Sequence, residues 1–264
     1  MNLGLGLSLS SARAASGGGA SYSAEATALF ARMSTQPDDT RKALINTFIV
    51  GLTTASLWTK LDALYVFAAG DTQAALLNWK GATFDASEVG SPVFTADRGY
   101  ASAAGAYIDS NMAQNVGGTQ YTQNAAVFGC YNNVAGTDGQ YLMGLVTNGS
   151  TRVIPKTALG GGNWRQNTGT TVTIPDGTVA SRVGAWSVVR ENSTTQTIRQ
   201  NGAQIHSGAA NSTALIAEDF VFLRASGADG SGRVATGIIG AMTGAEEATY
   251  RGLELTFLTA IGAN

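Results

Sequence analysis

Short apolar runs alternate with polar residues along most of the chain, and the clearest case surrounds Asn201-Gly202. This dipeptide favours a two-residue type I′ hairpin turn, because both residues adopt positive φ at low cost. Cross-strand partners would then be Gln200 with Ala203, Ile198 with Ile205, and Thr197 with His206. The pattern predicts an antiparallel sheet whose dry face holds Ile198 and Ile205 and whose wet face holds Arg199 and His206.

Strand-sized segments continue on both sides of this hairpin. Residues 61–69 are apolar on both alternating faces, as in a buried strand. After Pro92, further runs separated by Gly, Asn, Asp and Ser lie at about 92–96, 105–109, 123–132, 140–147, 151–155, 170–174, 183–190, 195–200, 203–207, 219–224 and 234–242. The Gly-rich segment 160–166 between them is predicted to be a loop. This spacing of turn residues is typical of a β-sandwich or barrel.

The longer helical patterns lie near the two ends of the chain, and residues 71–80 fit one or two further helical turns. Residues 24–52 carry a Ser cap and an apolar stripe, and Pro37 with Asp38 can open the second helix. Thr243 and Glu246 form a capping box ahead of a helix over about 244–261. We therefore predict a docking arm at 1–20, a helical segment at 21–60, and a sandwich over 61–264.

The first twenty residues have strand periodicity without a core of their own. Leu3, Leu5, Leu7 and Leu9 alternate with Gly, Asn and Ser, and the Gly-rich residues 16–20 form a flexible joint. Covering each leucine would contribute roughly 1.5–3 kcal/mol if its burial is complete. The segment is thus predicted to dock on another subunit, and identical arms on identical chains favour a closed assembly, for which we expect a homotrimer.

Composition narrows the function classes. Net charge is −2 and no Lys/Arg cluster occurs, so a nucleic-acid partner is not expected. His206 is the only histidine and Cys130 the only cysteine, which excludes an intrachain disulfide and a Cys/His zinc site. Nothing approaches the roughly 18 apolar residues of a membrane span. The N-terminus lacks the basic residues and continuous apolar run of a secretory signal.

Two stretches carry a resemblance to known proteins. The segment GAWSVVRENSTTQTIRQNGAQIHS, followed by FVFLRAS and TGIIGAMTGAEEATYRGLELTFLTAIG, resembles the C-terminal half of concanavalin A-like (LamG-type) jelly rolls. LDALYVFAAGDTQAALLNWK with SPVFTADRGYASAAGAYIDS is similar to a block in phage and prophage virion proteins of the tail-fibre or spike type. The resemblance covers about 37–264. It implies a mainly β, concanavalin A-like jelly-roll β-sandwich with short N-terminal helices and a C-terminal helix, carried on a virion.

Enzymatic chemistry is not favoured. Some jelly rolls are glycan hydrolases whose strand motif resembles Glu-x-Asp-x-Glu, and that spacing does not occur among the 18 acidic residues. A lone His206 on the wet face of a hairpin is a surface residue far more often than a general base. The segment 160–166 also lacks the lysine of a phosphate loop. We therefore predict that the protein is not an enzyme, with a glycan hydrolase as the third alternative.

A carbohydrate-binding module is the preferred function. Sugars are held by an aromatic face together with Asn, Asp and Arg hydrogen bonds. Candidate loop residues are Trp164 with Asn163 and Arg165, and Tyr131 with Asn132, Asn133 and Asp138. Tyr131 could also belong to the core. No cofactor or metal is predicted, although Asp138 or Asp109 could serve a lectin-like calcium ion.

The alternative is a virion decoration or adaptor protein that only packs against its neighbours. In either case the partners are other virion proteins, reached through the N-terminal arm, and the preferred function adds a host surface glycan.

Strand alternation and the hairpin register also predict which side chains are buried. Buried positions should be Cys130, Trp186, Ile198, Ile205, Phe222, Phe257 and Ile261, whereas Arg199, Asn201 and His206 should be exposed.

Overall fold

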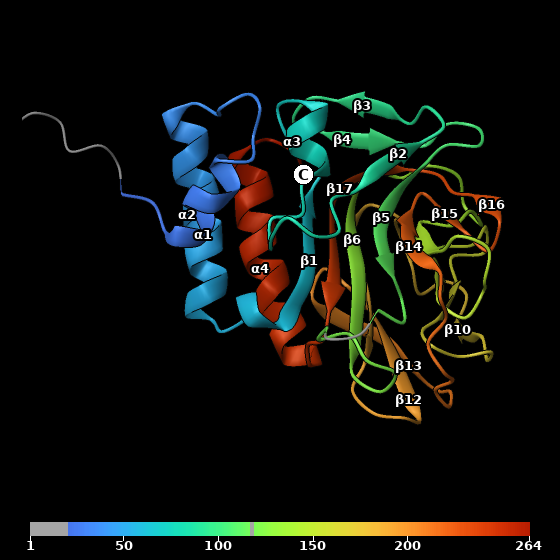
Figure 1. Ribbon diagram of the computed structural model, residues 1–264. Coiled ribbons are helices and arrows are strands. Elements are labelled where there is room, and N and C mark those ends of the chain that lie inside the picture. Colours follow the sequence, from blue (N-terminus) through green and yellow to red (C-terminus); the bar gives the residue numbers. More distant parts are fainter. Residues whose placement is uncertain (1–20, 117–118) are drawn as a thin grey trace, which may run out of the picture.

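Three layers make up the protein in the computed structural model, which describes residues 21–116 and 119–264 (Figure 1). A helical layer packs against one face of a β-sandwich made of two antiparallel sheets. The helices are α1 (Ala24–Phe30), α2 (Asp39–Thr54), α3 (Thr72–Leu76) and α4 (Gly244–Ala260), with a 3₁₀ turn at Trp58–Lys60. No helix in the described ranges is long and apolar enough to cross a membrane. The predicted leucine arm, 1–20, lies outside these ranges and stays a prediction.

The larger sheet has eight strands and lies in the middle of the molecule. Its order is β13 (Ala203–Ala209), β12 (Thr195–Gln200), β11 (Gly184–Arg190), β6 (Ala126–Val134), β17 (Arg233–Gly240), β4 (Gly99–Ala101) and β3 (Val93–Thr95). The eighth strand, β1 (Leu61–Val66), pairs antiparallel with β17 from Thr236 to Gly240. On its opposite edge β17 pairs along its length with β6, so it is the central strand that joins two parts of the sheet.

The second sheet has seven strands and forms the outer layer of the sandwich. Its order is β10 (Val172–Ile174), β9 (Gly162–Arg165), β8 (Arg152–Ile154), β7 (Met143–Leu145), β14 (Asp219–Phe222), β5 (Tyr107–Ala113) and β2 (Ser87–Val89). A two-stranded hairpin, β15 (Arg224–Ala225) and β16 (Ala228–Asp229), follows β14. The jelly-roll β-sandwich with N-terminal helices and a C-terminal helix, expected from the sequence, is thus the observed architecture.

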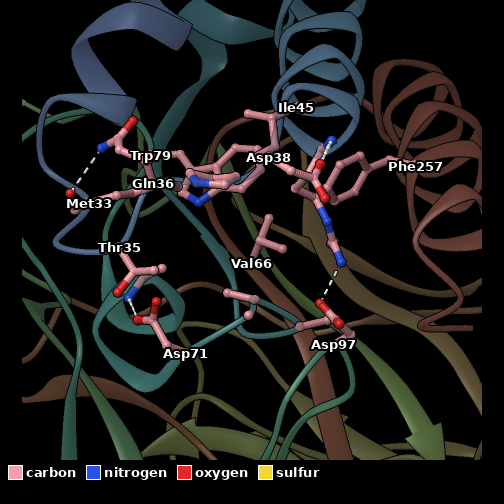
Figure 2. Close-up of a pocket in the computed structure, with 16 residues that line it drawn as sticks. Met33, Thr35, Gln36, Asp38, Ile45, Val66, Asp71, Trp79, Asp97 and Phe257 are labelled. Atoms are coloured by element: carbon pink, nitrogen blue, oxygen red, sulfur yellow. Dashed lines mark hydrogen bonds and ion pairs between the residues drawn. The ribbon is translucent and has the colours of Figure 1, made fainter.

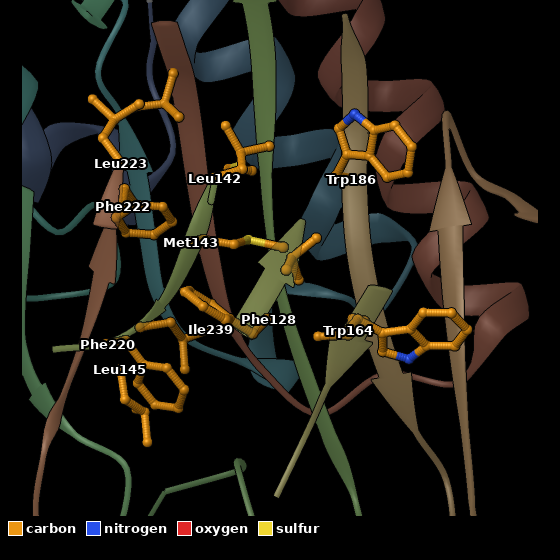
Figure 3. Packing of buried hydrophobic residues seen from close by; sticks show 14 of the residues in the cluster. Phe128, Leu142, Met143, Leu145, Trp164, Trp186, Phe220, Phe222, Leu223 and Ile239 are labelled. Carbon is orange, nitrogen blue, oxygen red and sulfur yellow. The ribbon is translucent and has the colours of Figure 1, made fainter. Parts of the chain in front are cut away.

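Two hydrophobic clusters hold the three layers together. The first fills the space between the sheets, where Phe128 of the larger sheet meets Phe220 of the smaller one with ring centroids 4.8 Å apart (Figure 3). The second lies between the larger sheet and the helices, where Phe48 of α2 stacks on Phe257 of α4 at 5.1 Å. The larger sheet therefore has no solvent-facing side over its central strands, because helices cover the face opposite the sandwich core.

A buried set of charges connects α4 to the larger sheet. Glu247 accepts hydrogen bonds from Arg199 Nε at 2.7 Å and from Arg251 Nε at 2.9 Å. Arg251 also pairs with Glu254 at 2.6 Å and donates from Nη2 to the Ser187 hydroxyl at 2.8 Å. Burial alone would lower the pKa of Arg251, but the charges of Glu254 and Glu247 outweigh it and leave that pKa raised. A side chain at Gly129, on β6, would displace the Arg251 guanidinium, because its Cβ would lie 2.3 Å from Nη2.

The Asn-Gly turn is confirmed, but the hairpin that it closes has a bulge. Asn201 and Gly202 have φ of 51° and 79°, and Gln200 pairs with Ala203 as expected. Beyond Arg199 the register shifts, so that Ile198 faces His206 instead of Ile205. The bulge brings the His206 ring to the sandwich side, where it meets Trp164 edge-on with centroids 5.7 Å apart. The prediction that His206 is exposed on a wet face was therefore wrong.

Most of the burial predictions hold. Cys130, Trp186, Ile198, Phe222 and Phe257 are buried and Asn201 is exposed. Ile205 and Ile261 are only half-buried. Arg199 was expected to be exposed and is only 9% exposed, because α4 covers the face of the hairpin on which it lies.

Candidate functional site

A cavity of about 330 Å³ opens where the helical layer meets the end of β1 (Figure 2). Its apolar wall is formed by Ile45 of α2, Val66 of β1 and Phe257 of α4, together with Met33 and Trp79 from loops. Its polar lining is Thr35, Gln36, Asp38, Arg41, Asp71 and Asp97. A cavity of this size lies at the lower end of the range for small-molecule sites.

Two helix caps place carboxylates at the cavity. Asp38 is the N-cap of α2, and one of its oxygens accepts the Arg41 backbone N–H at 2.7 Å. Asp71 is the N-cap of α3, and one of its oxygens accepts the Ala74 N–H at 2.9 Å. A capping aspartate uses a single oxygen for its helix. The second oxygen of each carboxylate has no partner among the described residues, which leaves two hydrogen-bond acceptors at the cavity lining.

An ion pair closes one side of the cavity. The Arg41 guanidinium pairs with the Asp97 carboxylate, and Figure 2 shows this pair to the right of Val66, whereas Asp71 lies below Trp79 on the left. Asp97 lies in the turn between β3 and β4 with φ of 57°, and its backbone N–H donates to the Ala69 carbonyl at 2.8 Å. The three aspartates and one arginine leave the polar side of the cavity with an excess of negative charge, which disfavours an anionic ligand.

The Trp79 indole lines the opposite side of the cavity. Its backbone N–H donates to the Leu64 carbonyl at 2.8 Å, and its ring meets Phe257 edge-on at 5.8 Å. The indole N–H is buried and has no hydrogen-bond partner among the described residues. A buried N–H without a partner is costly, so Trp79 is held in place by its apolar neighbours and not by a hydrogen bond from its ring.

The sugar-contacting residues expected around Trp164 lie elsewhere and have different roles. Trp164 belongs to β9, not to a loop, and its fully buried side chain fills the sandwich core (Figure 3). It is therefore not available as a sugar-stacking platform. Asn163 and Arg165 alternate with it and are half-buried, so their side chains lie on the outer face of the seven-stranded sheet.

The residues expected around Tyr131 also lie apart. Tyr131 packs under the helical layer and is 7% exposed. Asn132 is fully buried, where it donates to the Arg182 carbonyl at 2.9 Å and accepts the Arg233 N–H at 3.0 Å. Asn133 likewise donates to two backbone carbonyls, and Asp138 pairs with Lys156. The prediction that these residues form one loop site was wrong, because β6 places Tyr131 and Asn132 in the interior.

A calcium site has no cluster of ligands to support it. Asp109 caps its own turn by accepting the Asn111 N–H at 2.8 Å, and Asp138 is paired with Lys156. Within 21–116 and 119–264, no group of three or more His, Cys, Asp or Glu side chains is placed to hold a metal ion.

Sequence reasoning treated Asp38 only as a helix-capping residue and gave Asp71, Asp97 and Trp79 no role. The signal that could have found the cavity is the pair of Asp caps, in QPDD and AGDT, each followed by a helix. What the sequence could not show is that the turn carrying Asp97 folds back to Arg41, because that contact joins residues 56 positions apart.

The fold itself recurs in solved structures. A botulinum neurotoxin serotype D binding domain matches with a TM-score of 0.52 and 10% identity, over 75% of this chain and 52% of that one. A botulinum neurotoxin type C structure, studied for its interaction with two ganglioside molecules, gives 0.52 and 12%, over 76% and 53%. Domain 4 of the Geobacillus stearothermophilus arabinanase AbnA, in complex with arabinotriose, gives 0.49 and 13%, over 72% and 98%.

The TM-scores of the two toxin structures show a shared fold, a jelly-roll β-sandwich. The chain spans about half the length of the two toxin structures that it matches. No protein-family model and no curated protein sequence matches the chain.

Proposed function

We propose that this protein is a carbohydrate-binding component of a bacteriophage particle, of the tail-fibre or spike type, and that the cavity beside Asp38 and Asp71 holds a sugar residue of a host surface glycan. The observation that carries the proposal is the composition of the cavity. It has an apolar side that includes Trp79 and Phe257, and a polar side with unused carboxylate oxygens.

Such a lining suits a neutral sugar. Trp79 and Phe257 are each only 4% exposed, so the apolar side offers a pyranose ring limited C–H contact at the cavity wall and no open stacking face, while Asp38 and Asp71 accept from its hydroxyls. The negative excess favours an uncharged ring over one that carries a carboxylate or sulfate. The toxin type C structure, which shares the fold, concerns a protein that interacts with gangliosides; this supports a saccharide as the class of ligand, whereas the neutral charge is inferred from the cavity alone.

The virion location rests on the sequence. The resemblance to phage virion proteins lies in the block that begins at Leu61, and this block supplies β1, α3 and Asp71 of the cavity. Attachment to other virion proteins through Leu3, Leu5, Leu7 and Leu9, and assembly as a homotrimer, belong to the same proposal. The protein would act as a binder and not as an enzyme.

The test compares two neighbouring aspartates of α2. Asp38→Asn keeps the helix cap, because Asn caps as well as Asp, but it alters the group at the cavity. Asp39→Asn is the matched control, since Asp39 is exposed and does not line the cavity. A glycan array on the wild type should identify a neutral oligosaccharide, and calorimetry should then show about tenfold or greater weakening for Asp38→Asn and for Asp71→Asn. Equal affinity of all three variants and the wild type would refute the cavity as the site.

A non-binding decoration or adaptor protein is the second candidate. It is favoured by the fact that every charged group of the cavity already has one protein partner, since Asp38 and Asp71 cap helices and Arg41 pairs with Asp97. In that case the wild type would be incorporated into particles and would bind no glycan on the array. A glycan hydrolase, the third alternative, would instead shorten the oligosaccharides that it binds.

A further inference from the structure

Two arginines lie side by side on the outer face of the seven-stranded sheet. Arg152 of β8 and Arg165 of β9 are direct cross-strand partners. Their neighbours in sequence, Val153 and Trp164, point into the sandwich core, so both arginines point away from it. Like charges placed directly opposite each other destabilise a sheet. A pair of this kind needs an explanation that the fold alone does not provide.

The two guanidinium groups converge on one point. A Cβ built on Gly149 would lie 3.2 Å from Arg152 Nη1 and 3.5 Å from Arg165 Nη1, so both groups border the same small space. The closeness of the two guanidinium groups also affects the pKa of Arg165. Burial, and then the charge of Arg152, lower the pKa of Arg165.

Neither arginine is neutralised. All 18 acidic residues of the chain lie in the described ranges, and none of them forms an ion pair with Arg152 or Arg165. Arg165 donates to Thr171 Oγ1 at 2.8 Å and to the Gly149 carbonyl at 3.3 Å. Arg152 makes only long contacts with hydroxyls, to Tyr141 at 3.3 Å and Ser226 at 3.4 Å, and its buried Nε has no partner among the described residues.

The surroundings suit a sugar that bears a charge. Asn163 and Ile154 are paired on the same outer face, one step beyond Val153 and Trp164, and both are half-buried. They offer a hydrogen-bonding amide and an apolar contact beside the positive pair. The Tyr141 ring lies under the Arg152 guanidinium, with 5.9 Å between Cζ and the ring centroid.

We propose that Arg152 and Arg165 form a second binding site, which takes the carboxylate of an acidic saccharide. Arginine forks match the geometry of an oxyanion, and a bound carboxylate would replace the repulsion of the pair with two charge-assisted hydrogen-bonding groups. This site lies on the face of the sandwich away from the helices, whereas the cavity beside Asp38 lies among them. It therefore does not depend on the function proposed for that cavity.

The experiment uses the full chain and titrates digalacturonate, neutral digalactose and inorganic phosphate by calorimetry. Digalacturonate should bind, with an affinity that falls as the salt concentration rises, and Arg152→Gln and Arg165→Gln should each weaken it about tenfold or more. Arg98→Gln, at an exposed arginine away from this sheet face, is the control and should leave it unchanged. Each Gln variant should also keep or raise the thermal midpoint, because it removes like-charge repulsion.

Several outcomes would overturn the proposal. One is the absence of digalacturonate binding by the wild type, and another is binding that both Gln variants retain. Equal binding of digalactose would show that the charge is not recognised. Binding of phosphate without digalacturonate would overturn the assignment to a saccharide. Loss of digalacturonate binding with Asp38→Asn, but not with Arg152→Gln, would move the ligand to the cavity.

Discussion

The buried ion pairs at the contact between α4 and the larger sheet should contribute strongly to the stability of the protein. Glu247→Gln keeps the shape of the side chain and removes the one carboxylate that pairs with both Arg199 and Arg251. Arg199 then has no acidic partner among the described residues, whereas Arg251 keeps Glu254. Removal of one member of a buried ion pair costs about 3–5 kcal/mol, because the remaining charge stays desolvated. We expect a loss of this size in the free energy of unfolding.

The neighbouring residue supplies the control. Glu246→Gln changes the same chemical group one position earlier in α4, where the side chain is 32% exposed and lies 3.5 Å from Lys60. Gln can replace Glu in a capping box, and an exposed pair is worth about 0–1 kcal/mol. Urea unfolding followed by circular dichroism should therefore show a small change for Glu246→Gln and a large one for Glu247→Gln, with unchanged slopes.

A double-mutant cycle identifies the source of the loss. If Arg199 left without a partner carries the cost, then Arg199→Gln combined with Glu247→Gln should destabilise less than the two single changes added together, by about 0.5–3 kcal/mol. The reasoning would be refuted by equal midpoints for the Glu246 and Glu247 variants. Strict additivity in the cycle would show that Arg199 and Glu247 do not interact.

Three further predictions concern single side chains. Burial raises the pKa of the Cys130 thiol, so a thiol reagent such as DTNB should label it only after urea unfolds the chain. Trp164→Ala should lower the free energy of unfolding by about 3–5 kcal/mol, measured in urea, because it empties a fully buried site in the sandwich core. Burial, and then the charge of Asp219, raise the pKa of the Asp109 carboxyl, so its charged form destabilises the folded state. Asp109→Asn should therefore raise the thermal midpoint at neutral pH, and this advantage should vanish as the pH falls below the unfolded pKa of about 3.9.

Local signals in the sequence were enough to predict the class of fold. The turn at Asn201-Gly202 and the capping box at Thr243 depend on a few adjacent residues, and both are present as expected. What failed depends on distant parts of the chain. Strand alternation predicts an exposed Arg199, but Glu247 of α4, 48 positions later, supplies the carboxylate that allows Arg199 to be buried. The bulge beyond Arg199 is not marked by a Gly, Asn or Pro in the facing strand segment, Gln204 to His206, so the sequence does not predict it.

The candidate site was harder to predict for a related reason. Trp164 lies shortly after three glycines, which favour a loop, but Gly162 is the first residue of β9 and the other two glycines directly precede that strand. A Cβ at Gly162 would lie 2.7 Å from the Pro155 carbonyl, so the glycine is there for close strand contact. The cavity, by contrast, is formed by segments from four separate regions of the chain, and no local pattern links Asp38, Asp71 and Asp97.

The position of β17 has a consequence for the order in which the protein can fold. β17 and α4 are the last of the described elements to leave the ribosome, yet β17 separates β6 from β1, and α4 covers the sheet that β17 completes. Until they emerge, a nascent chain holds two unpaired strand edges and an uncovered apolar face. Folding should therefore wait until β17 and α4 are available, and it should be slow because its central contacts join distant residues. A chain that stalls before Arg233 should be an aggregating species and a target for chaperones, not a smaller folded domain.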